Sequence, residues 1–218
     1  MLTFDSVGKR QSPINFQTNE TVEANDVKLE LSFTDISSGT VYYNDTEGKV
    51  QVSTTSNGNV SFTAEEETSA WTMAQFHFHA PSEHTVDSKQ YDLEMHTVTT
   101  NNADGNQYLV SGLFWEFDAN AEDDAFLESL NLEALTPGTN AASHSADSTI
   151  KYKDLMDWAN GRETFYYQGG LTTPDCTEAV DFFIVKEPRK INSKQLTYFN
   201  RLWKDYSSFS GAGTGQYR

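Results

Sequence analysis

The strongest constraint on the fold is the alternating stretch Gln75-Phe76-His77-Phe78-His79. In a β-strand, side chains two residues apart point to the same face. His77 and His79 would therefore project together, and Gln75 would join them. We interpret this stretch as part of a polar site that is built on a strand.

A second stretch, Glu94-Met95-His96, has the same spacing. Four of the chain's five histidines lie between residues 77 and 96. If the two strands pair, the imidazoles of His77, His79 and His96 can converge on one point. Three neutral nitrogen ligands with an open fourth position are typical of a catalytic zinc site.

Two side chains are placed to orient these ligands. A zinc-bound histidine normally donates its second ring proton to a carboxylate, amide or carbonyl. Gln75 beside His77 and Glu94 beside His96 meet that need. If these were ordinary core histidines, several buried polar groups would lack partners, at a cost of about 1–3 kcal/mol each. His84 follows a turn-like segment, so we predict a structural hydrogen-bonding role for it.

The rest of the chain reads as one mostly β domain over residues 1–218. Period-two alternation, turn signals and apolar runs predict the strands, and the region 27–62 is expected to form an antiparallel meander. The expected strands are 27–33, 49–52, 71–79, 91–100, 107–117 and 180–185, and the expected helices are 121–131, 151–158 and 193–206. Acidic residues are expected in the first turn of helix 121–131. Residues 137–148 read as a polar loop that contains His144.

Composition excludes several classes of partner. Fifteen Lys and Arg against 32 Asp and Glu give a formal charge of −17, which disfavours nucleic acid and anionic membranes. No apolar run is long enough to predict a transmembrane helix. The N-terminal residues lack the basic start and apolar core of a signal peptide. Cys176 is the only cysteine, so no disulfide can form within the chain.

Several motifs occur together and in order. They are Gln11-Ser12-Pro13-Ile14, Gln75–His79, Ser82-Glu83-His84-Thr85-Val86-Asp87, Glu94–His96, Gly170-Leu171-Thr172-Thr173-Pro174 with Glu178, and Lys186-Glu187-Pro188. Together they resemble the signature of the alpha-class carbonic anhydrases from about residue 8 to about residue 206. The resemblance implies a mostly β fold with a few peripheral helices around a large, mainly antiparallel, twisted central sheet.

The resemblance also implies a function and its residues. The implied reaction is the reversible hydration of carbon dioxide to bicarbonate and a proton by zinc-bound hydroxide. His77, His79 and His96 would bind Zn²⁺, with Gln75 and Glu94 as acceptors for His77 and His96. Zinc lowers the pKa of bound water to about 7, an effect for which carbonic anhydrase is itself the usual example.

The remaining implied roles concern the hydroxide and the substrate. Thr172 would accept a hydrogen bond from the hydroxide and donate its own proton to Glu83, and Thr173 would help to hold bicarbonate or water. Carbon dioxide is apolar and needs an apolar slot. Its walls would be formed by Val98, Val110, Leu171, Val180 and Phe182. Phe182 stands where the family usually has Trp.

The chain departs from the family at three places. The segment expected to carry a proton-shuttle histidine reads Glu47–Val52, or Asn57-Gly58-Asn59 in an alternative alignment. Neither segment has a histidine, so we predict slower turnover that depends on buffer. The partner of Cys176 in secreted members is replaced by Asp5 or Ser6. Descent from a secreted form and pairing with another chain both fit that pattern. Both ends look short, as in a domain cut from a longer chain or completed by a partner.

Three readings of the function follow. The leading one is a zinc lyase, secreted or in an organelle lumen or periplasm, acting on a small molecule, with a homodimer or larger assembly left open. The second is a non-catalytic binding or structural module of the same fold. A zinc hydrolase acting on esters would share the site as a third.

Overall fold

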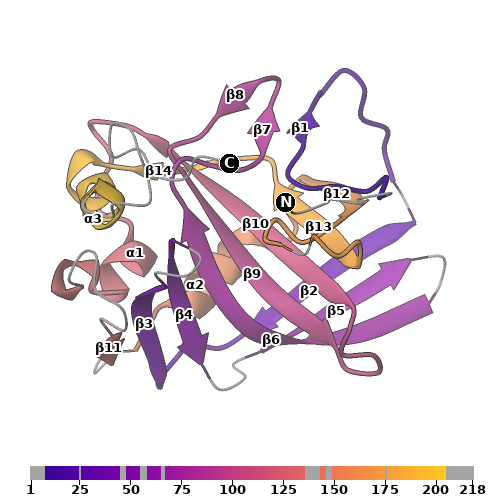
Figure 1. Ribbon diagram of the computed structural model, residues 1–218, viewed down its shortest axis with the longest axis horizontal. Helices are drawn as coiled ribbons and strands as arrows, with labels where there is room; N and C mark the ends of the chain where they lie inside the picture. Colours follow the sequence, from indigo (N-terminus) through magenta and orange to yellow (C-terminus); the bar gives the residue numbers. More distant parts are fainter. Residues whose placement is uncertain are drawn as a thin grey trace, which may run out of the picture.

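The computed structural model describes residues 8–24, 26–44, 48–54, 58–64, 67–135, 143–145, 149–174 and 176–204. Most of the described strands join into one large curled sheet, and helices lie along one of its sides (Figure 1). The expected mostly β fold with few helices and a mainly antiparallel central sheet is confirmed. Only the contacts of β10 with β13 and with β14 are parallel within this sheet.

The large sheet contains β2 (Val27–Phe33), β3 (Gly39–Asn44), β4 (Lys49–Thr54), β5 (Gly58–Ala64), β6 (Glu67–His79), β9 (Leu93–Asn101), β10 (Tyr108–Phe117), β11 (Ser143–Ser145), β12 (Thr164–Gly169), β13 (Val180–Val185) and β14 (Arg189–Ile191). A small second sheet consists of β1 (Asn15–Phe16), β7 (Thr85–Val86) and β8 (Lys89–Gln90). The helices are α1 (Ala125–Ser129), α2 (Tyr152–Ala159), α3 (Ser193–Lys204) and a 3₁₀ turn, Leu132–Ala134.

The main run of strands has the order β11-β3-β4-β6-β9-β10-β13-β12. The expected meander over residues 27–62 is wrong in one respect, because β2 pairs with β5 rather than with its neighbour β3. The long strand β6 explains this arrangement. Its first half pairs with β5 and its second half pairs with β4, so the strand pairs β2–β5 and β3–β4 both adjoin β6.

A register shift between Met73 and Gln75 changes which residues of β6 face the core. Before the shift, Trp71 and Met73 are buried in the larger hydrophobic cluster. After it, Phe76 and Phe78 are buried in the same cluster. One extra residue in a strand reverses the side-chain alternation beyond it. The polar side chains after the shift therefore point away from this core.

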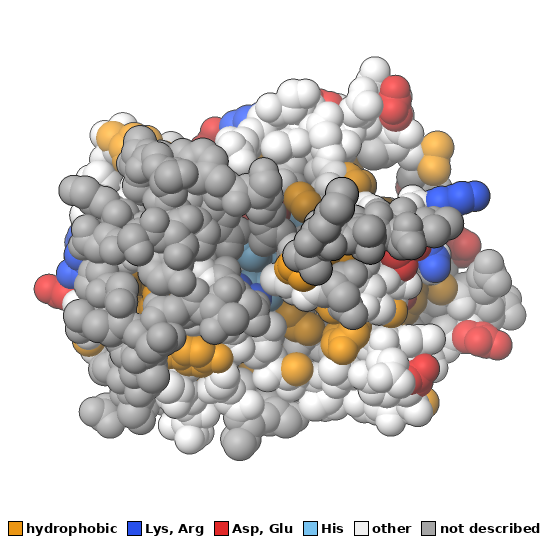
Figure 2. Space-filling view, in the orientation of Figure 1, with side chains coloured by type: hydrophobic (Ala, Val, Ile, Leu, Met, Phe, Trp, Pro, Cys, Tyr) orange, Lys and Arg blue, Asp and Glu red, His pale blue; other side chains and the backbone are white. Residues whose placement is uncertain are grey.

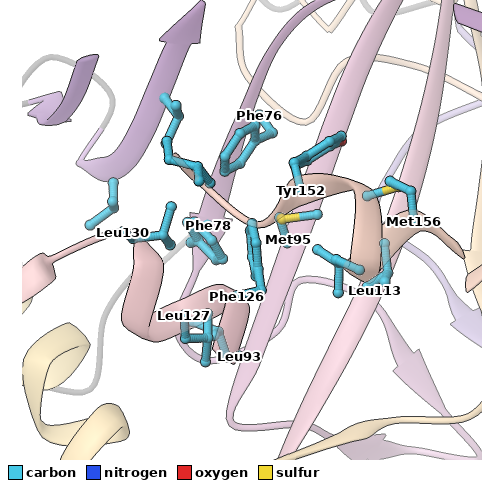
Figure 3. Close-up of a cluster of buried hydrophobic side chains, with 14 of the residues drawn as sticks. Phe76, Phe78, Leu93, Met95, Leu113, Phe126, Leu127, Leu130, Tyr152 and Met156 are labelled. Atoms are coloured by element: carbon cyan, nitrogen blue, oxygen red, sulfur yellow. The ribbon is translucent and has the colours of Figure 1, made fainter. Parts of the chain in front are cut away.

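The larger core packs the sheet against α1 and α2. Figure 3 shows Phe76 and Phe78 of β6 together with Phe126 of α1 and Tyr152 of α2. Tyr152 stacks on Phe76 with ring centroids 5.0 Å apart. This packing fixes one face of β6 and leaves its other face for the site.

Two elements differ from the sequence predictions. The helix expected at 121–131 is shorter, because Asp124 accepts hydrogen bonds from the backbone N–H groups of Phe126 and Leu127 and so caps α1 at its start. The acidic residues 122–124 consequently precede the helix rather than fill its first turn. The expected loop at 137–148 contains β11, which pairs with β3 and includes His144. The remainder of that loop and the end of the expected helix at 205–206 lie outside the described residues.

Within the described residues, no helix has the length and apolar character that a membrane crossing requires.

Candidate functional site

Strands β6 and β9 bring the three histidines together. They pair antiparallel, with His77 directly opposite His96 and His79 opposite Glu94. One ring nitrogen from each of His77, His79 and His96 lies within 4.8 Å of the other two. All three side chains are buried. Residues that are far apart in sequence thus form a compact group of nitrogen donors on rigid strands.

Hydrogen bonds orient two of these imidazoles. Nδ1 of His77 lies 2.9 Å from Oε1 of Gln75. Nε2 of His96 lies 2.7 Å from Oε1 of Glu94. Each acceptor side chain comes from the same strand as its histidine, two residues earlier. The sequence therefore folds each acceptor onto the same face as the histidine it orients.

Glu94 is held by four donors at the centre of the site. Its Oε1 is 2.7 Å from Nδ1 of His84 and from Nε2 of His96, and its Oε2 accepts the backbone N–H groups of Glu83 and His84. Burial disfavours the charged form, but the adjacent His84 and His96 outweigh it and keep the pKa of the Glu94 carboxyl well below its usual range.

A second group of potential ligands, His84, Glu94 and His96, is equally compact. A carboxylate offers about four lone-pair positions, and the four donors around Glu94 account for them. We therefore interpret this group as a hydrogen-bond network rather than a second metal site. The structural role predicted for His84 is confirmed by its contacts.

The network continues outward from His84. Nε2 of His84 lies 2.6 Å from the hydroxyl of Tyr167, which is 2.8 Å from Oγ of Ser12. Ser12 in turn accepts the N–H of Gly170 at 3.2 Å. Burial raises the pKa of the Tyr167 hydroxyl, which keeps it a neutral partner. Tyr167 was missed by sequence reasoning, since it lies in an aromatic run without a distinguishing spacing.

Glu83 lies against the histidines. Its Oε1 is 3.1 Å from Nδ1 of His79, its Oε2 is 3.8 Å from Nδ1 of His96, and its side chain is 3% exposed. Thr172 and Thr173 are half-buried in the loop between β12 and β13. That loop is anchored where Gly170 donates to Ser12 and where Leu171 donates to the carbonyl of Thr177.

The five apolar residues predicted to form a substrate wall lie together. Val110 on β10 is opposite Val98 on β9 and Phe182 on β13. The rings of Phe182 and His96 have centroids 6.0 Å apart. All of the following belong to or pack against one smaller hydrophobic cluster: Val98, Val110, Leu171, Val180 and Phe182. An apolar surface therefore adjoins the histidines.

Two further features lie elsewhere. A cavity of about 950 Å³ lies between β2 and β12, and its lining contains none of the histidines. Cys176 is a partly exposed free thiol in the β12–β13 loop. The residues expected to replace its usual partner, Asp5 and Ser6, lie outside the described residues.

Comparison with known proteins gives a consistent result. A family model described as eukaryotic-type carbonic anhydrase matches residues 3–211. A carbonic anhydrase of Pectobacterium atrosepticum is 31% identical over 195 residues, which cover 89% of this chain and 72% of that protein.

Solved structures agree with this match. The alpha-carbonic anhydrase of Thermovibrio ammonificans, in complex with the inhibitor sulfanilamide, has a TM-score of 0.75 at 27% identity, over 90% of this chain and 80% of that one. The alpha-carbonic anhydrase of Photobacterium profundum has a TM-score of 0.75 at 25% identity, over 90% and 82%.

Proposed function

Because the chain belongs to the eukaryotic-type carbonic anhydrase family, we propose that it hydrates carbon dioxide at a zinc ion bound by His77, His79 and His96. The observation that carries this proposal is the convergence of three buried ring nitrogens within 4.8 Å of one another. Imidazole nitrogen is a ligand that suits zinc, and three such ligands leave a coordination position for water or substrate.

The orientation of the rings supports the same ligand set. Nδ1 of His77 contacts Gln75, so in this proposal Nε2 of that ring would bind the metal. Nε2 of His96 contacts Glu94, so Nδ1 of that ring would bind the metal. Fixing the tautomers in advance removes an entropic and protonation cost from metal binding. The donor set therefore fits zinc in number, chemistry and orientation.

A bound zinc ion would lower the pKa of a coordinated water to about 7 and so supply a nucleophile at neutral pH, as is best known from carbonic anhydrases themselves. The chain's own residues would aim that nucleophile. In this proposal Thr172 accepts its hydrogen bond and donates to the buried carboxylate of Glu83, while Thr173 holds bicarbonate or water. The position of Glu83 beside the histidines supports this role.

The apolar group beside His96 would receive the substrate. Carbon dioxide has no net dipole or charge, so burial against apolar side chains binds it without hydrogen bonds. Val98, Val110 and Phe182 lie side by side on neighbouring strands, and their side chains share a face of the sheet with His96. Leu171 and Val180 complete this surface at the β12–β13 loop.

Proton removal is the step to which neither of the two remaining histidines is suited in this proposal. His84 is held between Glu94 and Tyr167, and His144 lies in β11, whose partner is β3. Strand β4, where the family resemblance places the shuttle, carries Lys49 and Gln51 instead. We expect the proton to leave by water and external buffer, which limits the rate.

The test combines metal content with activity. Wild type purified with zinc should contain one zinc ion per chain, hydrate carbon dioxide and be inhibited by sulfanilamide, the inhibitor in the Thermovibrio ammonificans structure. His96→Ala should lose most of its zinc and nearly all activity. His144→Ala, the same substitution at the remaining histidine, should change neither. Unchanged activity in His96→Ala would refute the ligand assignment.

The runner-up function, a non-catalytic module of the same fold, makes a different prediction. Wild type would then bind zinc, or none, without hydrating carbon dioxide in any buffer. The same measurements decide between the two functions.

A further inference from the structure

A cavity lies on the side of β10 that faces away from the histidines. Its volume is about 950 Å³, and β10 contributes Ser111 and Leu113 to its lining. The residue between them, Gly112, faces the histidine site instead. A Cβ atom at this position would lie 3.5 Å from Oε1 of Glu94 and 3.6 Å from Cδ2 of His96. Because successive side chains of a strand point to opposite faces, the cavity and the histidines lie on opposite sides of β10.

Segments that are far apart in the chain enclose this cavity. Figure 2 shows His side chains at the bottom of a central hollow, which belongs to the site described above. The cavity lies instead between β2, β12 and the segment 14–24 that precedes β2, on the right of Figure 1. A volume of this size is typical of sites that bind small molecules. The buried apolar side chains of its lining include Leu31, Leu113, Ala159, Phe183 and Val185.

One polar side chain in this wall has no partner. Ser111 is 2% exposed, and its Oγ makes no hydrogen bond with any described residue. Buried hydroxyls on the same face of the neighbouring strand β9 do have partners. Oγ1 of Thr97 lies 2.5 Å from the hydroxyl of Tyr152, and Oγ1 of Thr99 donates to the carbonyl of Leu109. Since a buried hydroxyl without a partner destabilises a protein, Ser111 offers a hydrogen-bonding group that the fold itself does not use.

The charges around the cavity indicate what kind of molecule it accepts. Both basic side chains of the lining are already bonded to carboxylates, those of Glu30 and Glu187. An anionic ligand would therefore find no unpaired cation in the described lining, and its charge would be buried without a counterion beside Ser111. The surroundings favour an uncharged ligand. The charged residues of the lining are Glu20, Glu23, Lys28, Arg162 and Glu163.

We propose that this cavity binds an uncharged amphiphile, a molecule with an aliphatic body and one hydroxyl group. The hydroxyl group bonds to Ser111, and the aliphatic body lies against Leu31, Leu113 and Phe183. Toward the mouth the body covers Val22, which belongs to the lining and is 89% exposed. Burial of apolar surface supplies the affinity, and the hydrogen bond sets the orientation. This binding does not depend on the reaction proposed for the histidines.

The first experiment measures binding by calorimetry with two probes of equal chain length, 1-octanol and sodium octanoate. Wild type should bind 1-octanol saturably, and octanoate roughly tenfold or more weakly, because its carboxylate would be buried without a counterion. Ser111→Ala should weaken 1-octanol binding roughly three- to tenfold, as expected for the loss of one hydrogen bond. The matched control is Ser32→Ala, at an exposed serine of β2 outside the lining. It should leave the affinity for 1-octanol unchanged.

Nuclear magnetic resonance locates the bound molecule. Strand β10 offers a matched pair of reporters, since Leu113 lines the cavity and Val110 lies in the apolar cluster beside the histidines. Intermolecular nuclear Overhauser effects from 1-octanol should reach the methyl groups of Leu113 and Leu31. Contacts with the methyl groups of Val110 alone would place the molecule at the histidine site and overturn the proposal.

The stability of the ligand-free protein gives a further readout. Because the hydroxyl of Ser111 has no partner, Ser111→Ala should unfold at the same denaturant concentration as wild type or at a higher one. A lower midpoint would show that the hydroxyl serves the fold, and would overturn the proposal. So would failure of wild type to bind 1-octanol saturably, or equal affinity in wild type and Ser111→Ala. None of these outcomes changes the zinc and hydration measurements, which test the histidine site separately.

Discussion

His77 and His96 lie directly opposite each other across the β6–β9 ladder, with ring centroids 5.4 Å apart. The two residues come from different strands, yet backbone hydrogen bonds on both sides of each strand fix their separation. If the two residues bind a metal as proposed, ligands placed this way would need little reorganisation on binding. The site is thus a property of strand register as much as of residue type.

The first prediction follows from the proposal that no histidine of the chain serves as a proton shuttle. In a weakly buffered assay, hydration by wild type should then rise with imidazole concentration, roughly tenfold or more before it saturates, because imidazole would remove the proton in place of such a shuttle. Stopped-flow measurements at constant ionic strength test this. A high rate that does not depend on the imidazole concentration would contradict this prediction. The control replaces imidazole with sodium sulfate at the same ionic strength.

The second prediction concerns the four donors around Glu94. Glu94→Gln replaces one acceptor oxygen by an NH₂ group, which cannot accept from His84, His96 or the backbone. Zinc affinity should fall about 10–100-fold, as is usual when the acceptor of a metal-bound histidine is altered. Chelator competition measures the change. Glu116→Gln, at a carboxylate bonded to Lys89 and Lys190 on the surface, should leave zinc affinity as it was.

The third prediction concerns Tyr167. Tyr167→Phe removes the hydroxyl that bridges His84 and Ser12, leaving buried polar atoms without that partner. Unfolding free energy should fall by about 1–3 kcal/mol, measured by denaturant titration. Tyr166→Phe is the neighbouring control. Its hydroxyl donates to the half-buried Asp181, so a smaller loss of unfolding free energy is expected. A larger loss than in Tyr167→Phe would contradict the importance given to the hydrogen bonds that join His84, Tyr167 and Ser12.

The fourth prediction concerns Asp124, the N-cap of α1. Its carboxylate also accepts from Nε1 of Trp115 at 3.0 Å and from Nε of Arg189 at 2.7 Å. Asp124→Ala should lower the free energy of unfolding by about 2–4 kcal/mol, because it removes a cap and leaves a buried indole N–H without an acceptor. Asp123→Ala removes an exposed ion pair with Lys194 and a hydrogen bond from the Asn192 side chain, so the free energy of unfolding should fall much less. Equal losses in the two variants would contradict this account.

The sequence predicts local features of this protein well. Alternation locates β2 to the residue, and the apolar run Val180–Val185 locates β13, which is buried at every position but Asp181. Spacing also places His77 beside Gln75 and His96 beside Glu94, since both relationships lie within single strands. The apolar residues beside His96 follow from the family resemblance and are brought together by the β9–β10–β13 register.

Long-range relationships are less accessible from sequence. The pairing of β2 with β5 and the contacts of Tyr167 with His84 and Ser12 join residues with no local pattern between them. Asp124 shortens α1 because its side chain caps the start of the helix. The sequence alone does not distinguish Asp124 from Glu122 and Asp123 in that role.

The shift between Met73 and Gln75 has a consequence for how such a chain tolerates change. If the same residues continued in regular alternation past Met73, the odd-numbered positions of β6 would remain in the core, and His77 and His79 would be carried there while Phe76 and Phe78 emerged at the site. Ala74, a small and exposed residue, is the additional residue whose accommodation decides which side chains of β6 reach the site. Substitution of Ala74 should be tolerated, and its deletion would restore regular pairing with Phe76 and Phe78 still in the core, whereas insertion of one residue into Gln75–His79 without a second bulge would exchange the two sides of the strand beyond it.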